Sequence, residues 1–309
     1  MLAKFRVCDK LQVFPGGLMT STESAEQQTK GIILFLVLVI VLSGLVYTLF
    51  FAPTPFAGGG GGHYVEALMW CPAMAAFLTL LITRGNIATL GLSRFAPRYA
   101  LIGYLIPLAY AAVAYIGVWS FGLGGFPSVK GIAELAGRVG WHVTAPGAFI
   151  PPYFLLVATT FMLGAVARAL GEEIGWRGYL APRMVARLGF TGGAILSGAI
   201  WASWHIPIMM FGNYNAGTPF WFGFTCFASF VIASAVILTW LRLKSASVWP
   251  CAILHASHNA FIQTFFTPLT APKGTITAYA IDEFGFATPL LAIVIAVYFW
   301  RRRKEVSAA

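Results

Sequence analysis

The sequence predicts an all-α polytopic membrane protein with about eight transmembrane helices. The composition carries this prediction, because 59% of the 309 residues are hydrophobic and only 10% are charged. Soluble domains carry about 25% charged residues, and here the deficit extends along the whole chain without a contrasting polar domain. A membrane-spanning helix needs about 20 mostly apolar residues, and the sequence contains eight such segments.

The eight apolar segments set the expected domain organisation. We expect helices at 31–51, 65–83, 100–121, 150–176, 190–211, 219–241, 247–267 and 286–300. They form a single transmembrane domain over residues 31–300. We expect residues 1–30 to be a disordered cytoplasmic tail and residues 301–309 to be a basic cytoplasmic tail. The first segment is too long, and too far from residue 1, for an ordinary cleaved signal sequence.

The placement of Lys and Arg predicts the orientation. With an even number of spans both termini share one side, and the opposite side carries only Lys130, Arg138 and Lys273. Because cytoplasmic loops of membrane proteins are rich in Lys and Arg, we expect both termini in the cytoplasm. The net charge of +10 then reflects basic loops next to the lipid bilayer. No aromatic–basic motif indicates nucleic acid as a partner, and the four scattered cysteines have no metal-binding or redox spacing.

Polar residues inside the apolar segments gather in three helices of the second half. The fourth segment carries Glu172 and Glu173, the fifth His205, and the seventh His255 and His258. Ionisable groups in a membrane are costly and usually face the bundle interior, where they mark functional sites. The rise of an α-helix places Glu172, His205 and His255 near the middle of the membrane. Of the three histidines, only His258 is expected to have a packing role.

Helical spacing separates the two acids. Glu173 and Arg177 are four residues apart with the acid first, which favours an ion pair within the helix. Glu172 then lies about 100° round the helix as the unpaired acid. An unpaired buried carboxylate is suited to take up and release a proton as a general base. The reverse assignment, with Glu173 as the base, remains the alternative.

The two histidine-bearing helices show the same four-residue spacing. His255 and Asn259 share one helix face and can donate hydrogen bonds toward one point, while Trp201 and His205 share a face of the fifth segment. Pro207 follows, so we expect an irregular backbone near His205.

Together these motifs resemble the CPBP family, the CAAX-protease and bacteriocin-processing group of intramembrane endopeptidases that includes Rce1-like and Abi-type proteins. The motifs are Glu-Glu-x-x-x-Arg (Glu172–Arg177), aromatic-x-x-x-His (Trp201–His205) and His-x-x-x-Asn (His255–Asn259). They stand in the family's order, and the resemblance covers roughly residues 150–267. The aromatic residue of the second motif is commonly Phe and is Trp in this chain.

The resemblance implies an eight-helix intramembrane glutamic endopeptidase that needs no cofactor. Glu172 would be the general base that activates a water, His205 would hold the same water, and His255 with Asn259 would form an oxyanion hole. The supporting residues would be Glu173, Arg177 and Trp201. The implied partner is a peptide or protein substrate that enters from the membrane or the cytoplasm: a prenylated CAAX protein, a peptide leader or a bacteriocin. The implied location is the plasma membrane of a prokaryote.

Other functions use the same residues. Glu172, His205 and His255 could bind Zn²⁺ as in a His₂Glu metalloprotease, although the His-Glu-x-x-His motif is absent and we favour the metal-free mechanism. A non-enzymatic immunity or scaffold protein, or a proton-coupled transporter, would also place acids and histidines inside the membrane.

Overall fold

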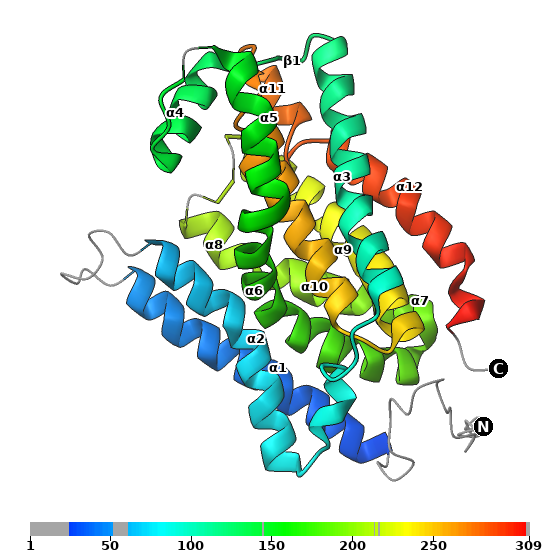
Figure 1. Ribbon diagram of the computed structural model, residues 1–309. Helices are drawn as coiled ribbons and strands as arrows, with labels where there is room; N and C mark the ends of the chain where they lie inside the picture. Colours follow the sequence, from blue (N-terminus) through cyan, green and yellow to red (C-terminus); the bar gives the residue numbers. More distant parts are fainter. Residues whose placement is uncertain (1–24, 52–60, 144, 213, 216, 307–309) are drawn as a thin grey trace.

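The computed structural model describes residues 25–51, 61–143, 145–212, 214–215 and 217–306 of the protein (Figure 1). This part of the chain is almost entirely helical. The α-helices are α1 (Ala25–Phe51), α2 (Gly61–Thr83), α3 (Pro97–Ser120), α4 (Val129–Val139), α5 (Pro146–Leu156), α6 (Met162–Glu173), α7 (Ala181–Trp204), α8 (Ile206–Phe211), α9 (Phe220–Ser245), α10 (Trp249–His258), α11 (Ile276–Ala280) and α12 (Ala287–Arg301).

Shorter elements complete the architecture. Three π-helical segments extend neighbouring α-helices: η2 (Val157–Phe161), η3 (Ile174–Leu180) and η4 (Asn259–Phe266). Two 3₁₀ turns are η1 (Ile87–Leu90) and η5 (Arg303–Glu305). The strands β1 (Gly124–Gly125) and β2 (Ala271–Pro272) pair antiparallel, which ties the connection after α3 to the connection after η4.

The fold class predicted from the sequence is confirmed, since the described chain is all-α and rich in apolar helices. Within the described residues, five helical stretches are long and apolar enough to cross a membrane: Glu26–Leu49, Tyr64–Thr83, Pro97–Ser120, Gly147–Phe211 and Phe220–Ser245. The fourth stretch contains two of the predicted spans. Helix α12 is apolar but shorter. The exact number of eight spans stays a prediction.

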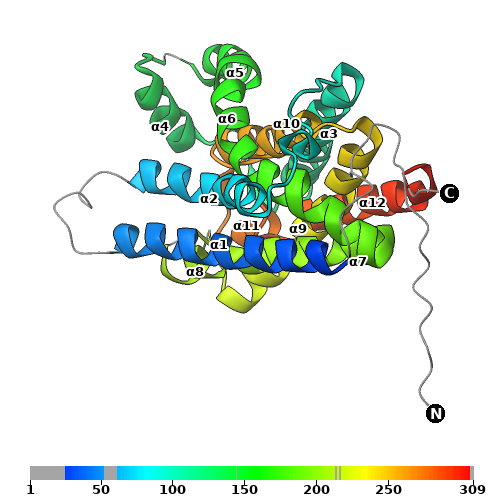
Figure 2. The ribbon, with the colours of Figure 1, turned by 90° about the horizontal axis from the view of Figure 1, so that it is seen from below.

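Helix α9 is the centre of the bundle and α1 lies at its edge. In the most apolar 18-residue window of each helix, the buried share is 67% for α9 and 22% for α1. Helix α9 packs against α7, α10 and α12, while α6 packs against α2 and α10. Helices α1 and α2 run side by side along one flank (Figures 1 and 2). The helices that carry the predicted site residues are therefore in contact with one another through the middle of the bundle.

Two backbone features set the ends of the site-bearing helices. The chain is helical from Pro146 until Gly189, whose φ of 70° and ψ of 173° interrupt the helix; glycine adopts a positive φ without the steric cost of a Cβ. Phe190 then starts a new helical stretch, as predicted. Helix α7 ends at Trp204; His205, with φ −83° and ψ −8°, caps it, and Pro207 lies in the first turn of α8. The irregular backbone expected near His205 is thus confirmed.

The structure adds elements that hydropathy alone did not predict. Helix α1 begins at Ala25, so residues 25–30 are helical instead of part of the tail, while residues 1–24 lie outside the described residues. Helix α4 is amphipathic and short; the Ser128 side chain caps it by accepting a hydrogen bond from the Gly131 N–H at 3.0 Å. Helices α8 and α11 were likewise not predicted as separate elements.

Replacing Gly175 with Ala is expected to destabilise the protein by about 1–3 kcal/mol, the usual cost of overpacking. A Cβ at Gly175 would lie 2.4 Å from Cβ and 2.6 Å from the carbonyl carbon of Pro72, inside the α2–η3 contact. Gly164→Ala on α6 is the matched control, because its nearest neighbour would be an Arg168 nitrogen at 3.6 Å. Thermal unfolding in detergent measures both variants; equal melting temperatures would contradict the prediction.

Candidate active site

The two adjacent glutamates lie at the end of α6, in a segment that passes through the middle of the bundle. Every residue from 171 to 185 is buried, which explains how neighbouring side chains about 100° apart on a helix are both hidden from solvent. Glu172 is 2% exposed and Glu173 is 0% exposed. The π-helical segment η3 follows directly after Glu173, and such segments often occur at functional sites.

Glu173 is the hub of a buried ion-pair network. Its Oε1 accepts hydrogen bonds from Nη1 of Arg177 and from Nδ1–H of His255, each at 3.0 Å. The guanidinium of Arg177 in turn stacks over the Trp201 ring, 4.0 Å from its centroid. The pair with Arg177 matches the spacing in the sequence. The bond to His255 joins residues 82 positions apart and was not predicted.

Glu172 makes a different contact. Its Oε2 accepts a hydrogen bond from Nε1–H of Trp201 at 2.6 Å. Electrostatic interactions also couple the Glu172 carboxylate to His205 and to His255. Trp201, expected to be a supporting residue, thus connects the two glutamates: it donates a hydrogen bond to Glu172, and its ring lies under Arg177, the partner of Glu173. The two acids occupy distinct environments in one cluster.

The ring nitrogens of the two histidines are assigned by their partners. Nδ1 of His205 lies 2.9 Å from the Trp201 carbonyl oxygen, which only accepts, so Nδ1 carries the proton. Nδ1–H of His255 is held by Glu173 in the same way. In the neutral ring each Nε2 is then an acceptor. Backbone and carboxylate partners therefore fix the tautomers and orient both imidazoles.

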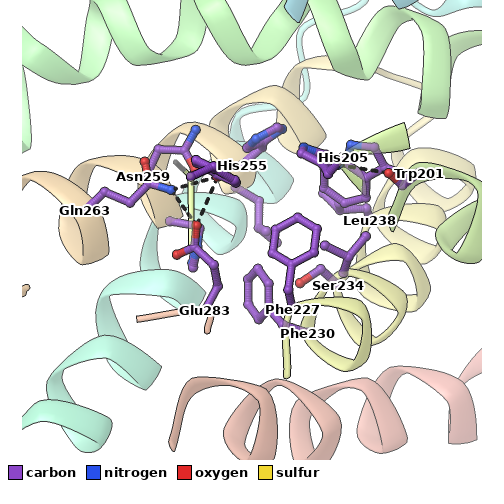
Figure 3. Close-up of a pocket in the computed structure, with 14 residues that line it drawn as sticks. Trp201, His205, Phe227, Phe230, Ser234, Leu238, His255, Asn259, Gln263 and Glu283 are labelled. Atoms are coloured by element: carbon purple, nitrogen blue, oxygen red, sulfur yellow. Dashed lines mark hydrogen bonds and ion pairs between the residues drawn. The ribbon is translucent and has the colours of Figure 1, made fainter. Parts of the chain in front are cut away.

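A small cavity of about 30 Å³ lies between the helices that carry these histidines. This is roughly the space that one or two water molecules need. Figure 3 shows His205 and Trp201 on one side and Asn259, Gln263 and Glu283 on another. His255 also lines it. The remaining lining residues are Tyr214, Phe227, Phe230, Val231, Ser234, Leu238, Leu254 and His258. Glu172 is not among the lining residues, but its partner Trp201 is.

His258 is held by packing and by polar partners on two elements. Its Nδ1 hydrogen-bonds the Tyr110 hydroxyl at 2.7 Å, and its ring stacks on Phe230 with centroids 4.3 Å apart. Its Nε2 lies 3.5 Å from Oε2 of Glu283. The expectation of a packing histidine is confirmed, and the ring is in addition part of the cavity wall.

Sequence reasoning missed the acidic wall of the cavity. Glu283 is 1% exposed, and its Oε1 accepts hydrogen bonds from Nε2 of Gln263 at 2.8 Å and from the Tyr214 hydroxyl at 3.1 Å. The sequence did contain a signal for this wall, because Asp282 and Glu283 are two adjacent acids in a chain that has only ten acidic residues. They stand just outside the last apolar segment, where loop acids are common.

Asp282 lies in the connection between α11 and α12, outside the membrane-spanning helices. Burial and the neighbouring Glu283 carboxylate raise the pKa of Asp282 well above its usual range. Its Oδ1 accepts a hydrogen bond from the Glu283 N–H at 2.8 Å, and its φ is 65°. An asparagine can make the same hydrogen bond and tolerates this left-handed backbone.

Asp282→Asn is therefore expected to stabilise the protein at neutral pH. Above the unfolded-state pKa of about 3.9, folding must either protonate Asp282 or bury its charge. That cost grows by about 1.4 kcal/mol per pH unit until the folded-state pKa is reached. The gain in melting temperature over the wild type should thus be small near pH 4 and rise toward pH 8. A gain that does not depend on pH, or a loss at pH 8, would contradict the prediction.

The zinc alternative would need Glu172, His205 and His255 to converge as ligands on one metal ion. Within the described residues, no group of three or more His, Cys, Asp or Glu side chains is arranged to hold a metal ion. Of the three proposed ligands, His255 is bound by Glu173 and Glu172 is bound by Trp201. The side chains are thus arranged in hydrogen-bonded pairs with one another.

Comparisons with known proteins fall on the same part of the chain. Residues 152–261 match the family model of type II CAAX prenyl endopeptidases, Rce1-like. The chain is 33% identical over 102 residues to CAAX prenyl protease 2 of Methanococcus maripaludis. The aligned region covers 31% of this chain and 34% of that protein. The chain thus matches about a third of the length of this curated relative. Residues 152–261 include every predicted site residue, so the predicted resemblance to the Rce1-like family is confirmed over the segment that carries the motifs.

Proposed function

We propose that the protein is an intramembrane endopeptidase that hydrolyses a peptide bond with a glutamate-activated water. The observation that carries the proposal is the convergence of His205, His255 and Asn259 on one small cavity in the middle of the bundle. Glu172 belongs to the same cluster through its hydrogen bond with Trp201, which also lines the cavity. The family match of the same segment supports a peptidase. An amide carbonyl resists attack by neutral water, and these residue types supply what the reaction lacks: a base and hydrogen-bond donors.

In this mechanism Glu172 removes a proton from the attacking water. The unprotonated Nε2 of His205 accepts a hydrogen bond from that water. It then takes the proton from Glu172 and passes it to the nitrogen of the leaving amine as the C–N bond breaks, which returns both side chains to their starting states. Trp201 positions Glu172 through its indole N–H. A general base contributes about 10²–10⁴ to the rate, so the cluster needs no serine or cysteine nucleophile.

The oxyanion that forms on the scissile carbonyl is stabilised by Asn259 and His255. The Asn259 side chain donates from its amide. His255 can donate from Nε2 only in its doubly protonated form, because Nδ1–H is already held by Glu173, and the Glu173 carboxylate compensates that positive charge. One such donor is worth about 2.7–4 kcal/mol of barrier. Glu173 and Arg177 are positioning residues that act through His255 and Trp201.

The substrate class follows from the relative alone. We propose a protein with a prenylated CAAX tail, as the name of the Methanococcus maripaludis protein indicates; a peptide leader or a bacteriocin are the other candidates. We further propose that both termini face the cytoplasm of a prokaryotic cell, so that substrate reaches the cavity from the membrane or the cytoplasm.

Activity is expected to survive removal of metal ions. Purified protein in vesicles, offered farnesylated and unmodified peptides of the same sequence, should cleave one of them at the same rate before and after treatment with EDTA or 1,10-phenanthroline. The reason is that the proposed base and oxyanion donors are all side chains. Loss of cleavage with chelator and its return with Zn²⁺ would replace this mechanism with the metalloprotease alternative, and absence of cleavage of any peptide would count against a peptidase.

A further inference from the structure

A second hollow lies between α3, α9 and α12, and it shares no residue with the catalytic cavity. Its volume is about 590 Å³, within the roughly 300–1,000 Å³ of small-molecule sites. The lining residues on α3 are Arg98, Tyr99, Ile102, Ile106 and Ala109. The lining residues on α9, α12 and η5 are Trp240, Lys244, Ile295, Tyr298, Phe299, Arg302 and Glu305.

Polarity changes along this cleft. On α3 the lining positions run from Arg98 through Ile102 and Ile106 to Ala109, at the four- and three-residue spacing of one helix face. This stretch is about 16 Å long at 1.5 Å per residue. Helices α3 and α12 run in opposite directions (Figure 1). The start of α3 and the end of α12 therefore form one charged end of the cleft, and apolar side chains line the remainder.

The charged end carries an excess of positive charge. Three cations, from Arg98, Lys244 and Arg302, face one acid, Glu305. Glu305 accepts hydrogen bonds from Arg302 at 2.6 and 3.0 Å and pairs with Lys244 at 3.2 Å. The Lys244 and Arg302 side chains are 32% and 38% exposed. Two positive charges thus remain uncompensated at the mouth.

Aromatic side chains hold the cations in place. The Arg302 guanidinium lies 4.9 Å from the Trp240 ring centroid and donates to the Tyr298 hydroxyl at 2.8 Å. The Trp240 indole N–H donates to the Arg302 carbonyl at 3.1 Å. Trp and Tyr are enriched where a membrane protein meets the headgroup layer. The geometry therefore combines an ordered basic mouth at the level of headgroups with an apolar channel directed into the membrane.

We propose that this cleft binds one anionic phospholipid. Its phosphate lies among Arg98, Lys244 and Arg302, and one acyl chain lies along Ile102, Ile106 and Ile295. Basic pockets between transmembrane helices bind anionic headgroups in this way. A free phosphate would leave the apolar channel unused, and a neutral lipid would leave the two extra charges uncompensated. The site does not depend on the proposed peptidase activity.

The test is lipid retention by the full-length protein purified in detergent. Native mass spectrometry after exchange into phosphatidylglycerol micelles should find one retained lipid, and fewer with phosphatidylcholine. The double variant Arg98→Ala/Lys244→Ala should weaken retention about thirtyfold, at about fivefold per basic residue near the headgroups. The matched control, Lys130→Ala/Arg138→Ala on α4, removes the same charge far from the cleft and should retain the lipid.

Ile106→Trp separates the two halves of the proposal, because it fills the apolar channel without changing charge; it should also reduce retention. Displacement of the lipid by inorganic phosphate at millimolar concentration would reduce the cleft to an anion site and overturn the proposal. Equal retention of phosphatidylcholine, unchanged retention in both cleft variants, or displacement by a farnesylated peptide would likewise overturn it, the last by making the cleft a substrate site. The circular dichroism spectrum of each variant reports whether it is folded.

Discussion

Replacing Glu172 with glutamine is expected to lower the rate of peptide hydrolysis by about 10²–10⁴ while the protein remains folded. That range is the usual contribution of a general base. Glutamine keeps the shape of the side chain and can still accept a hydrogen bond from Trp201 through its carbonyl oxygen, so the packing around this 2% exposed residue is preserved. What it loses is the capacity to take a proton from water. The measurement is single-turnover cleavage of a peptide by protein in vesicles, with thermal unfolding as the check on folding.

Two comparison variants make this result specific. Glu66→Gln also changes an acid to an amide, but on the exposed face of α2, where Glu66 lies 3.7 Å from Arg168; it should cleave at the wild-type rate. Glu173→Gln should lower stability as well as rate, because Glu173 binds Arg177 and His255. Full activity of Glu172→Gln would refute the proposed base. If Glu173→Gln alone removed activity from a stable protein, the two glutamates would have exchanged roles.

The same variant distinguishes an enzyme from a scaffold in the cell. A comparison of membrane proteomes between cells with wild-type protein and cells with Glu172→Gln should reveal peptides that stay uncleaved in the variant. If Glu172→Gln protected cells from a bacteriocin as well as the wild type does, the protective function would not require catalysis. Uptake of a solute driven by a proton gradient would instead indicate a transporter.

The fold could be predicted from sequence to the extent that it depends on local hydropathy. All eight apolar segments are helical, and the start near Phe190 and the irregularity near His205 follow from Gly189 and Pro207. The exact ends were less predictable. Helix α1 extends back into polar residues, since Lys30 and Glu26 form an i,i+4 pair at 2.7 Å, and the π-helical segments depend on packing between helices.

The contacts of the candidate site likewise include some that the sequence predicts and some that it does not. The Glu173–Arg177 pair was predictable because helical spacing alone brings those residues together. The His255–Glu173 and Trp201–Glu172 contacts were not, because they join residues 82 and 29 positions apart and depend on how helices rotate against one another. Glu283 was missed for a related reason: a loop acid carries no periodicity, and only the fold places it against the cavity.

Replacing Arg177 with methionine is expected to destabilise the protein by about 3–5 kcal/mol, the cost of leaving one partner of a buried pair uncompensated. Arg177 is 1% exposed, and no other Lys or Arg in the described chain forms a salt bridge with Glu173. The variant would leave the Glu173 carboxylate buried with only His255 as a partner. It would also remove the cation stacked on Trp201, the residue that positions Glu172. Thermal unfolding and cleavage rate should therefore fall together.

A double variant tests whether the loss comes from the stranded charge. In Glu173→Gln/Arg177→Met both charges are absent, and an amide and a thioether fill similar volumes. Because removal of a whole buried pair costs much less than removal of one partner, the double variant should unfold at a higher temperature than Arg177→Met alone. Its cleavage rate should stay low, since His255 no longer has a carboxylate to compensate its positive charge. A double variant less stable than Arg177→Met would show that the Glu173 carboxylate stabilises the protein through His255 even without the arginine, so that the loss in Arg177→Met does not come from a stranded charge. Recovery of full activity would remove Glu173 from the positioning role.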